Sequence, residues 1–238
     1  MPDGRTAILF FSHRPAREWH NKRFVEAGYV KNRRVAAAFY EHARKAVAKS
    51  ALPVLEAHGP QQRGDTFGAR LANAFADAFA AGYDRVIAVG SDCPTLHEVD
   101  WAAVEARLAD GTPVLGPTAN GAGTYLIGLT RAQFDWTTFA TLPWQSPTLL
   151  AALHHHLASD IGTTPALRPP RADVNGHADL VYLVRRAPAP PRGLVDRLRA
   201  VLGGISTAGS PTTAPASPRT ALRRRPRAPP APPRSPCA

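Results

Sequence analysis

The strongest constraint on the fold is the alternation of short apolar runs with longer amphipathic ones. Residues 7–11 and 85–90 are almost continuously apolar, and residues 66–81 carry apolar side chains at three- and four-residue spacing. A short continuous run is typical of a strand buried on both faces, whereas the wider spacing is typical of a helix with one buried face. Such alternation predicts an α/β fold with a mostly parallel sheet between two helix layers.

The rest of the chain extends this pattern. Further strands are expected at 53–57, 114–116 and 125–129, and further helices at 34–50, 100–109, 147–159, 178–185 and 194–202. Gly82 is placed to end the helix over residues 66–81. Residues 12–32 form an unusually long polar connection, which favours a functional loop.

Composition divides the chain near residue 203. Residues 203–238 hold six of the arginines, nine of the 24 prolines and no acidic residue, so they carry more than half of the net charge of +11. A segment so poor in apolar residues cannot offset the entropy of ordering. We expect one domain over residues 1–202 and a disordered Pro/Arg-rich tail over 203–238. Because the charge is concentrated in the tail, no specific nucleic-acid binding is expected.

The chain shows no signal for a membrane or for secretion. It contains no run of eighteen apolar residues, and its N-terminus lacks the small-residue cleavage site of a signal peptide. Cys93 and Cys237 lie far apart in unlike surroundings, so a disulfide framework is not expected. These features favour a cytoplasmic protein with no membrane partner.

The first candidate site is the GSDCP segment, residues 90–94, which directly follows the most apolar strand. Ligands of open α/β sheets bind outside the carboxyl ends of the strands. A carboxylate at this position, Asp92, is suited to Mg²⁺ or Mn²⁺, and Ser91 beside it is a candidate nucleotide contact. The alternative is that Asp92 caps the following helix. Cys93 invites interpretation as a nucleophile, but packing is favoured because no histidine accompanies it in a thiol motif.

The second candidate lies at the start of the helix over residues 66–81. Gly64, Asp65, Gly68 and Arg70 surround its first turn, where backbone N–H groups can meet an anion. Gly68 allows close approach by a ligand or by backbone, and Arg70 supplies a cation for phosphate. Capping by Asp65 or Thr66 explains part of this pattern but not all of it.

A third candidate is the DVNGHADL segment, residues 173–180. Asp173 and Asn175 offer hard oxygen ligands for a metal, and Asp179 lies in a first helical turn where negative charge is favoured. The alternative is ordinary turn formation at Asn-Gly. The three histidines at 154–156 cannot converge on one metal from a helix and are interpreted as a partly exposed helix surface.

Three segments of the chain, two of which are the first two candidate sites, together resemble a known family. They are GDTFGARLANAF from Gly64, GSDCPTL from Gly90, and GPTANGAGTYLIGL from Gly116. They are similar to the bacterial glycosyltransferase-A-like transferases associated with radical-SAM/selenodomain proteins and arsenosugar biosynthesis. That family is related to the nucleotidyltransferases of molybdenum-cofactor dinucleotides and 2-phospholactate. The resemblance covers residues 6–185.

The resemblance implies a glycosyltransferase-A (nucleotide-diphospho-sugar transferase) fold and a metal on Asp92, with the 173–180 segment nearby. In the family's first loop, a glycine and basic residues lie near the nucleotide phosphates. Here the glycine is missing, and Lys22 and Arg23 are the matching basic residues. The acidic residue of a later D-G-G-Y-Y loop is also replaced, since this segment begins at Asn120.

We therefore expect metal-dependent transfer of a glycosyl group from a nucleotide-diphosphate sugar to an unknown small-molecule acceptor. The expected nucleotide contacts are Lys22, Arg23, Gly64, Asp65, Gly68, Arg70 and Ser91, and the expected metal ligands are Asp92, Asp173 and Asn175. Nucleotidyl transfer on the same fold is one alternative. A catalytically eroded protein that binds a nucleotide or a partner is another, favoured by the two departures from the family pattern.

Overall fold

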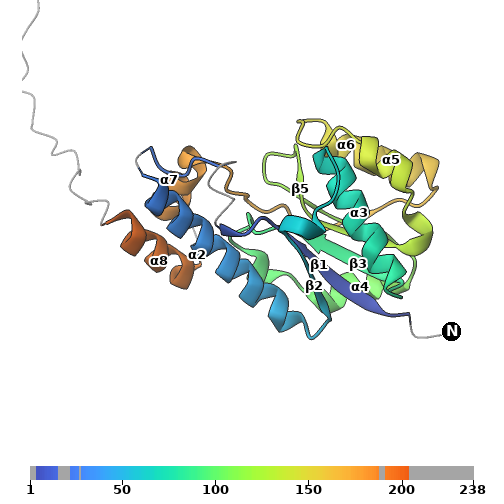
Figure 1. Ribbon diagram of the computed structural model, residues 1–238. Coiled ribbons are helices and arrows are strands. Elements are labelled where there is room, and N and C mark those ends of the chain that lie inside the picture. The colour runs from blue at the N-terminus through green and yellow to red at the C-terminus, as the bar shows by residue number, and fades with distance from the viewer. Residues whose placement is uncertain (1–3, 16–21, 27, 188–190, 204–238) are drawn as a thin grey trace, which may run out of the picture. The chain divides into compact units, whose positions relative to one another are not determined.

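The computed structural model describes residues 4–15, 22–26, 28–187 and 191–203. In this part of the chain six strands form one sheet in the order β2-β1-β3-β5-β4-β6. Four of them, β1, β2, β3 and β5, are labelled in Figure 1. The strands are β1 (Thr6–Phe11), β2 (Val54–Ala57), β3 (Arg85–Val89), β4 (Val114–Pro117), β5 (Thr124–Thr130) and β6 (Ala166–Leu167). Among them β5 runs antiparallel to both of its neighbours, while the other pairs are parallel. The predicted α/β fold with a mostly parallel sheet is confirmed.

Helices follow most of the strands. They are α2 (Tyr29–Val47), α3 (Phe67–Ala80), α4 (Trp101–Ala109), α5 (Trp136–Thr141), α6 (Leu149–His155), α7 (His177–Arg185) and α8 (Arg192–Leu202). The helix predicted over residues 66–81 is α3. The hydroxyl of Thr66 caps it by accepting a hydrogen bond from Ala69 N at 3.0 Å. Gly82, in the left-handed region with φ 88°, directly follows the helix and its C-cap residue.

Alternate residues of each central strand point to opposite faces of the sheet, and both faces are covered. From β1, Ala7 and Leu9 pack with side chains of α3, α5 and α6, whereas Ile8 and Phe10 pack with α2 and α4. Because successive side chains of a strand alternate, a strand covered on both faces must be apolar throughout. This explains the continuous apolar runs and gives three layers, with α3, α5 and α6 gathered on one side in Figure 1.

A third cluster joins α2, α7 and α8. It contains Phe24, Val35, Leu183 and Leu194, each almost fully buried. A fully buried Leu or Phe contributes roughly 1.5–3 kcal/mol. Phe24 lies two residues after Lys22, a candidate site residue. The packing of Phe24 in this cluster therefore also fixes the segment that carries Lys22.

The polar connection after β1 is shorter than predicted, because α2 begins at Tyr29 and not at residue 34. The reason is Asn32, which is buried inside the first turn. Its Oδ1 accepts hydrogen bonds from Phe24 N at 2.8 Å and Val25 N at 3.1 Å, and its Nδ2 donates to Val25 O at 3.0 Å. A polar residue that looks like part of a loop is therefore a buried helical anchor.

The prediction of a partly exposed helix surface at the three histidines is wrong for His156. This residue is 4% exposed, and its Nδ1 lies 2.9 Å from Asp160 Oδ2 across one widened turn, His156–Asp160. The short elements α5 and β6 were not predicted. The expected tail, apart from Gly203, lies outside the described residues, so the domain boundary remains a prediction.

Candidate functional site

One cleft of about 1040 Å³ opens at the carboxyl ends of β1 and β3. The first residues of β5 lie at the same edge because β5 is antiparallel, with Leu126 paired to Val89. The cleft is lined by these strand ends, by the first turns of α3, and by parts of the segments 118–124, 144–149 and 173–175. Its position agrees with the general placement of ligands in open α/β sheets.

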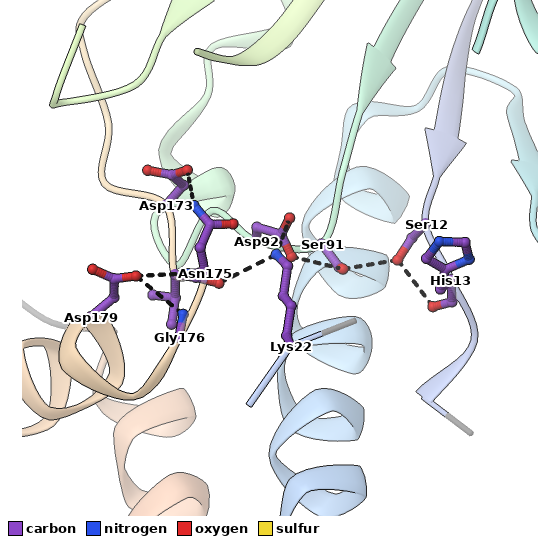
Figure 2. Close-up of polar contacts among 10 residues, drawn as sticks. Ser12, His13, Lys22, Ser91, Asp92, Asp173, Asn175, Gly176 and Asp179 are labelled. Carbon is purple, nitrogen blue, oxygen red and sulfur yellow. Dashed lines mark hydrogen bonds and ion pairs between the residues drawn. The ribbon is translucent and has the colours of Figure 1, made fainter. Parts of the chain in front are cut away.

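The residues after β3 form the centre of this edge. Ser12 Oγ donates a hydrogen bond to Ser91 Oγ at 2.8 Å, and Ser91 Oγ lies 3.5 Å from Asp92 Oδ1 (Figure 2). Both serines are buried, whereas the Asp92 side chain is 38% exposed and lines the cleft. The ends of β1 and β3 are thus joined through side chains, and the carboxylate at the end of this chain of contacts faces the cleft.

Asp92 does not cap a helix among the described residues. The turn that follows, Leu96–Glu98, has Thr95 at its N-terminal boundary, and α4 is capped by Asp100, whose carboxylate accepts from Ala103 N at 3.0 Å. The capping alternative therefore does not explain this carboxylate.

Lys22 supplies a positive charge directly beside Asp92. Its Nζ lies 2.5 Å from Asp92 Oδ2 and 3.4 Å from the carbonyl oxygen of Val174, and its side chain is only 14% exposed (Figure 2). A carboxylate oxygen and a carbonyl oxygen around one cation are also the groups that a hard divalent ion uses. The ammonium group therefore marks a position with the electrostatic character of a cation site.

The segment 173–175 lies directly beside Asp92. Val174 N donates a hydrogen bond to Asp92 O at 2.9 Å, which fixes this loop against the end of β3. Asn175 Nδ2 donates to the carboxylate of Asp173, and both residues line the cleft. Asp179 has a different role, because its Oδ2 accepts from Asn175 N at 2.9 Å and Gly176 N at 3.2 Å and so closes the turn that starts α7.

Arg171 anchors this loop from behind. Its Nη1 donates to Glu98 Oε2 at 2.7 Å and to Thr95 O at 3.0 Å. These bonds hold the segment that leads to Asp173 against the turn after β3. The side chain is 12% exposed, so the ion pair with Glu98 is largely shielded from water on the arginine side. The sequence offered no signal for this role beyond a basic residue two positions before Asp173.

The segment 64–71 is used mainly for packing. A Cβ on Gly68 would overlap the carbonyl oxygen of Ala140 and the ring of Trp144, so the glycine is required for close contact of α3 with α5 and with the segment that follows α5. Arg70 lines the cleft, and its Nη1 also reaches the carbonyl oxygens of Gly64 and Asp65, each at 3.4 Å.

The predicted nucleotide contacts therefore separate into two groups. Lys22, Arg70 and Ser91 line the cleft, as do all three predicted metal ligands. Arg23, Gly64, Asp65 and Gly68 are not among the residues that line it. Their roles, like those of the first group, remain predictions.

Cys93 behaves as a core residue. It is 3% exposed and packs with Ile87, Val89 and Leu96, while burial raises the pKa of its thiol to about 11. The thiol therefore remains protonated at neutral pH, which agrees with packing and disfavours a nucleophilic role.

Several polar residues of the cleft were not predicted. Ser12 lies at the end of β1, and Gln62 Nε2 donates to Ser12 O at 3.2 Å and to Ala57 O at 2.9 Å. Trp144 and Gln145 come from the segment between α5 and α6. Ser12 could have been found by the argument applied to Asp92, since it directly follows a predicted strand.

The donor set around Asp92 suits a cation that keeps some of its water. Among the described residues no group of three or more His, Cys, Asp and Glu side chains is arranged to hold a metal. Asp92, Asp173 and Asn175 offer two carboxylates and an amide, which is the kind of partial set that Mg²⁺ completes with water and substrate phosphates.

No helix in the described part of the chain is long and apolar enough to cross a membrane.

The first of two similar solved structures agrees with this fold. One similar solved structure is a "putative nucleotide-diphospho-sugar transferase" from Desulfovibrio desulfuricans G20, with a TM-score of 0.60 and 22% identity over 83% of this chain and 95% of that one. Another is the homologue, from Mycobacterium sp. strain JC1, of Mycobacterium tuberculosis Rv0371c, with a TM-score of 0.41 and 13% identity over 82% of this chain and 98% of that one. None of the curated proteins matches the chain.

The first of these structures shows that the chain has a nucleotide-diphospho-sugar transferase fold. The family model described as "Uncharacterized protein conserved in bacteria (DUF2064)" matches residues 26–146, just over half of the chain. This match includes α3, β3 with Asp92, and the whole of β4 and β5. The chain therefore belongs to the bacterial DUF2064 family.

Proposed function

We propose that the protein transfers a glycosyl group from a nucleotide-diphosphate sugar to a small-molecule acceptor, with Mg²⁺ or Mn²⁺ at Asp92. The observation that carries this proposal is the exposed carboxylate of Asp92 at the end of β3, inside the cleft and joined to the 173–175 loop. We include in the proposal the narrower kinship with transferases associated with radical-SAM/selenodomain proteins and arsenosugar biosynthesis.

Asp92, Asp173 and Asn175 are the residues that would hold the metal. A bound divalent ion would neutralise charge on the leaving diphosphate. In the present arrangement the positive charge beside Asp92 is supplied by Lys22, whose Nζ lies 2.5 Å from Asp92 Oδ2. With a metal on Asp92, the lysine would exchange its carboxylate partner for a phosphate oxygen without leaving the cleft.

The second cation of the cleft is Arg70. Its contacts with two carbonyl oxygens, each at 3.4 Å, are long for hydrogen bonds. A phosphate would therefore gain a charge-assisted partner at small cost in lost contacts. Lys22 and Arg70 together would hold the diphosphate, while Ser12 and Ser91 keep the ends of β1 and β3 at a fixed spacing.

Calorimetric titration of UDP and GDP with Mn²⁺ tests the site. Asp92→Asn should weaken metal-dependent nucleotide binding at least about tenfold, which is about 1.4 kcal/mol. Asp110→Asn is the matched control, because Asp110 is an exposed carboxylate at the end of α4 that does not line the cleft. Unchanged affinity in Asp92→Asn, or equal losses in the two variants, would contradict the proposal.

The type of reaction needs a separate measurement. Incubation with a nucleotide sugar and Mn²⁺ should release nucleoside diphosphate, by transfer or by slow hydrolysis. Nucleotidyl transfer on the same fold would instead release pyrophosphate from a nucleoside triphosphate. Binding without either product would favour a protein that has kept the nucleotide site and lost turnover.

A further inference from the structure

Two segments of the cleft wall carry no charge. Beyond Asp92 along the same edge of the sheet, the lining comes from residues 118–127 and from residues 144–149. The charged side chains that line the cleft, Lys22, Arg70, Asp92 and Asp173, all belong to other segments. Within these two described segments the polar side chains are hydroxyls, amides, a phenol and an indole.

The two segments form one continuous wall. Leu150 N, at the start of α6, donates a hydrogen bond to Ala122 O at 3.1 Å, which joins the α6 side to the β4–β5 hairpin. The hairpin closes on itself through Thr118 N and Gly123 O at 2.9 Å. Asn120 Oδ1 accepts from Thr118 Oγ1 at 2.7 Å and from Ala122 N at 3.1 Å. The side-chain NH₂ of Asn120 is thus the group that can donate to a hydroxyl oxygen of a ligand.

Trp144 and Gln145 complete this wall with a ring held by its contacts and with an exposed amide. The Trp144 Nε1 donates to Phe139 O at 2.7 Å, and the ring packs on Phe139 and Phe67 with centroid distances of 4.9 and 5.6 Å. Gln145 has φ 61°, a left-handed conformation that is uncommon for a residue other than glycine. Such backbone strain often occurs where a side chain must be held in a functional place.

We propose that this neutral subsite, defined by Asn120, Trp144 and Gln145, binds an uncharged sugar of the donor. The inference rests on the proposed function and deepens it, since it states the class of sugar. Leu126 is paired with Val89, so the neutral wall begins next to the site where Asp92 would hold the metal and Lys22 a phosphate oxygen. The sugar is attached to that diphosphate and must lie within reach of it.

The chemistry of the wall matches hydroxyl groups and not a carboxylate. Amide and hydroxyl groups exchange hydrogen bonds with sugar hydroxyls, and an aromatic ring packs on the C–H face of a sugar ring. A uronic acid would bring a negative charge to a wall without a cation of its own. Partial removal of that charge from water would be uncompensated and therefore costly.

The test compares UDP, UDP-glucose and UDP-glucuronate by calorimetry with Mn²⁺, and GDP, GDP-mannose and GDP-mannuronate if guanine is the preferred base. Within each pair the two sugars differ by one carboxylate. We expect the neutral sugar to bind at least about tenfold more tightly than the uronate. Gln145→Lys should reduce or reverse this ratio, because it adds a cation to the wall, and the affinity of the same variant for the nucleoside diphosphate alone is the reference against which both sugars are compared.

The outcomes separate the two levels of the proposal. Failure of both UDP and GDP to bind would overturn the proposed function and this inference with it. Diphosphate binding without a preference for the neutral sugar, or with a preference for the uronate, would overturn the inference alone. A ratio unchanged in Gln145→Lys would show that this wall does not contact the sugar and would also overturn it.

Discussion

Residues 64–71 and residues 90–92 look alike in sequence, since each combines glycine with aspartate beside a regular element. In the structure they differ. The first segment uses Gly68 for close packing against Trp144 and Thr66 to cap α3. The second places Asp92 in the cleft, where Lys22 meets it. The difference shows that the position relative to the strand ends, and not the presence of glycine, decides which aspartate lines the cleft: Asp92 does and Asp65 does not, although Arg70 of the first segment also lines it.

The largest effect expected from this comparison is on stability. Gly68→Ala should lower the free energy of unfolding by about 2–4 kcal/mol, because the new methyl group overlaps backbone and an indole ring that cannot easily move. Gly193→Ala in α8 is the control, since nothing lies within 4 Å of its added Cβ, and it should cost nothing. Urea denaturation measures both. Equal effects of the two substitutions would show that the packing role of Gly68 is wrong.

The next effect concerns metal binding without nucleotide. Lys22→Gln removes the cation that Asp92 now pairs with, so affinity for Mn²⁺ alone should rise by roughly tenfold, whereas affinity for nucleoside diphosphate should fall. Electron paramagnetic resonance of free Mn²⁺ follows the first change. Arg70→Gln serves as the control. Arg70 contacts the carbonyl oxygens of Gly64 and Asp65, which are not expected metal ligands, so its substitution should leave the binding of Mn²⁺ alone unaffected. Weaker Mn²⁺ binding in Lys22→Gln would contradict the competition.

A smaller effect is expected at the cap of α3. Thr66→Ala removes the hydroxyl that accepts from Ala69 N and should cost about 1 kcal/mol of stability. Nucleotide affinity should not change, because Thr66 is not among the residues that line the cleft. Thr66→Ser is the matched variant that keeps the acceptor. A loss of nucleotide affinity in Thr66→Ala with Thr66→Ser unaffected would show that the cap of α3 also belongs to the binding site.

The smallest effect expected is the reactivity of the Cys93 thiol, which adjoins Asp92 in the chain but faces the core. With its pKa raised to about 11 by burial, only about one thiol in a thousand is ionised at pH 8. In a Cys237→Ser variant, iodoacetamide should therefore label the folded protein very slowly, with the rate increasing as pH rises toward 11. Rapid labelling at pH 8 would mean that the thiol is accessible and that Cys93 does not belong to the core.

Local periodicity was sufficient to predict the layers and the place of Asp92. The runs at β1 and β3 are apolar because both faces of those strands are covered, and that requirement is visible in one dimension. The carboxylate directly after β3 then falls at the edge of the sheet. Long-range contacts were not predictable in this way. Asn32 is held by Phe24 and Val25, and Arg171 by Glu98, through bonds that no spacing rule announces.

The neutral wall of the cleft was missed for a related reason. Gln145 has a left-handed backbone conformation, which a sequence usually indicates by a glycine. A glutamine at this position therefore gives no signal of a turn. Trp144 looks like an ordinary core residue, and its ring does pack on Phe139. Asn120 stands out in the sequence only as a replacement for an acidic residue, and its place in the cleft depends on the direction of β5.

That direction has a further consequence for how proteins with this fold can diverge. Because β5 reverses, a hairpin and not a helical crossover connects it to β4, and residues 118–123 close on themselves at the mouth of the cleft. The tip is nevertheless tied to its surroundings, since Ala119 N donates a hydrogen bond to Arg171 O at 2.7 Å and Leu150 N donates one to Ala122 O at 3.1 Å. Divergence in the sequence or length of this tip must therefore preserve these two backbone bonds, or it will also move the loop that carries Asp173.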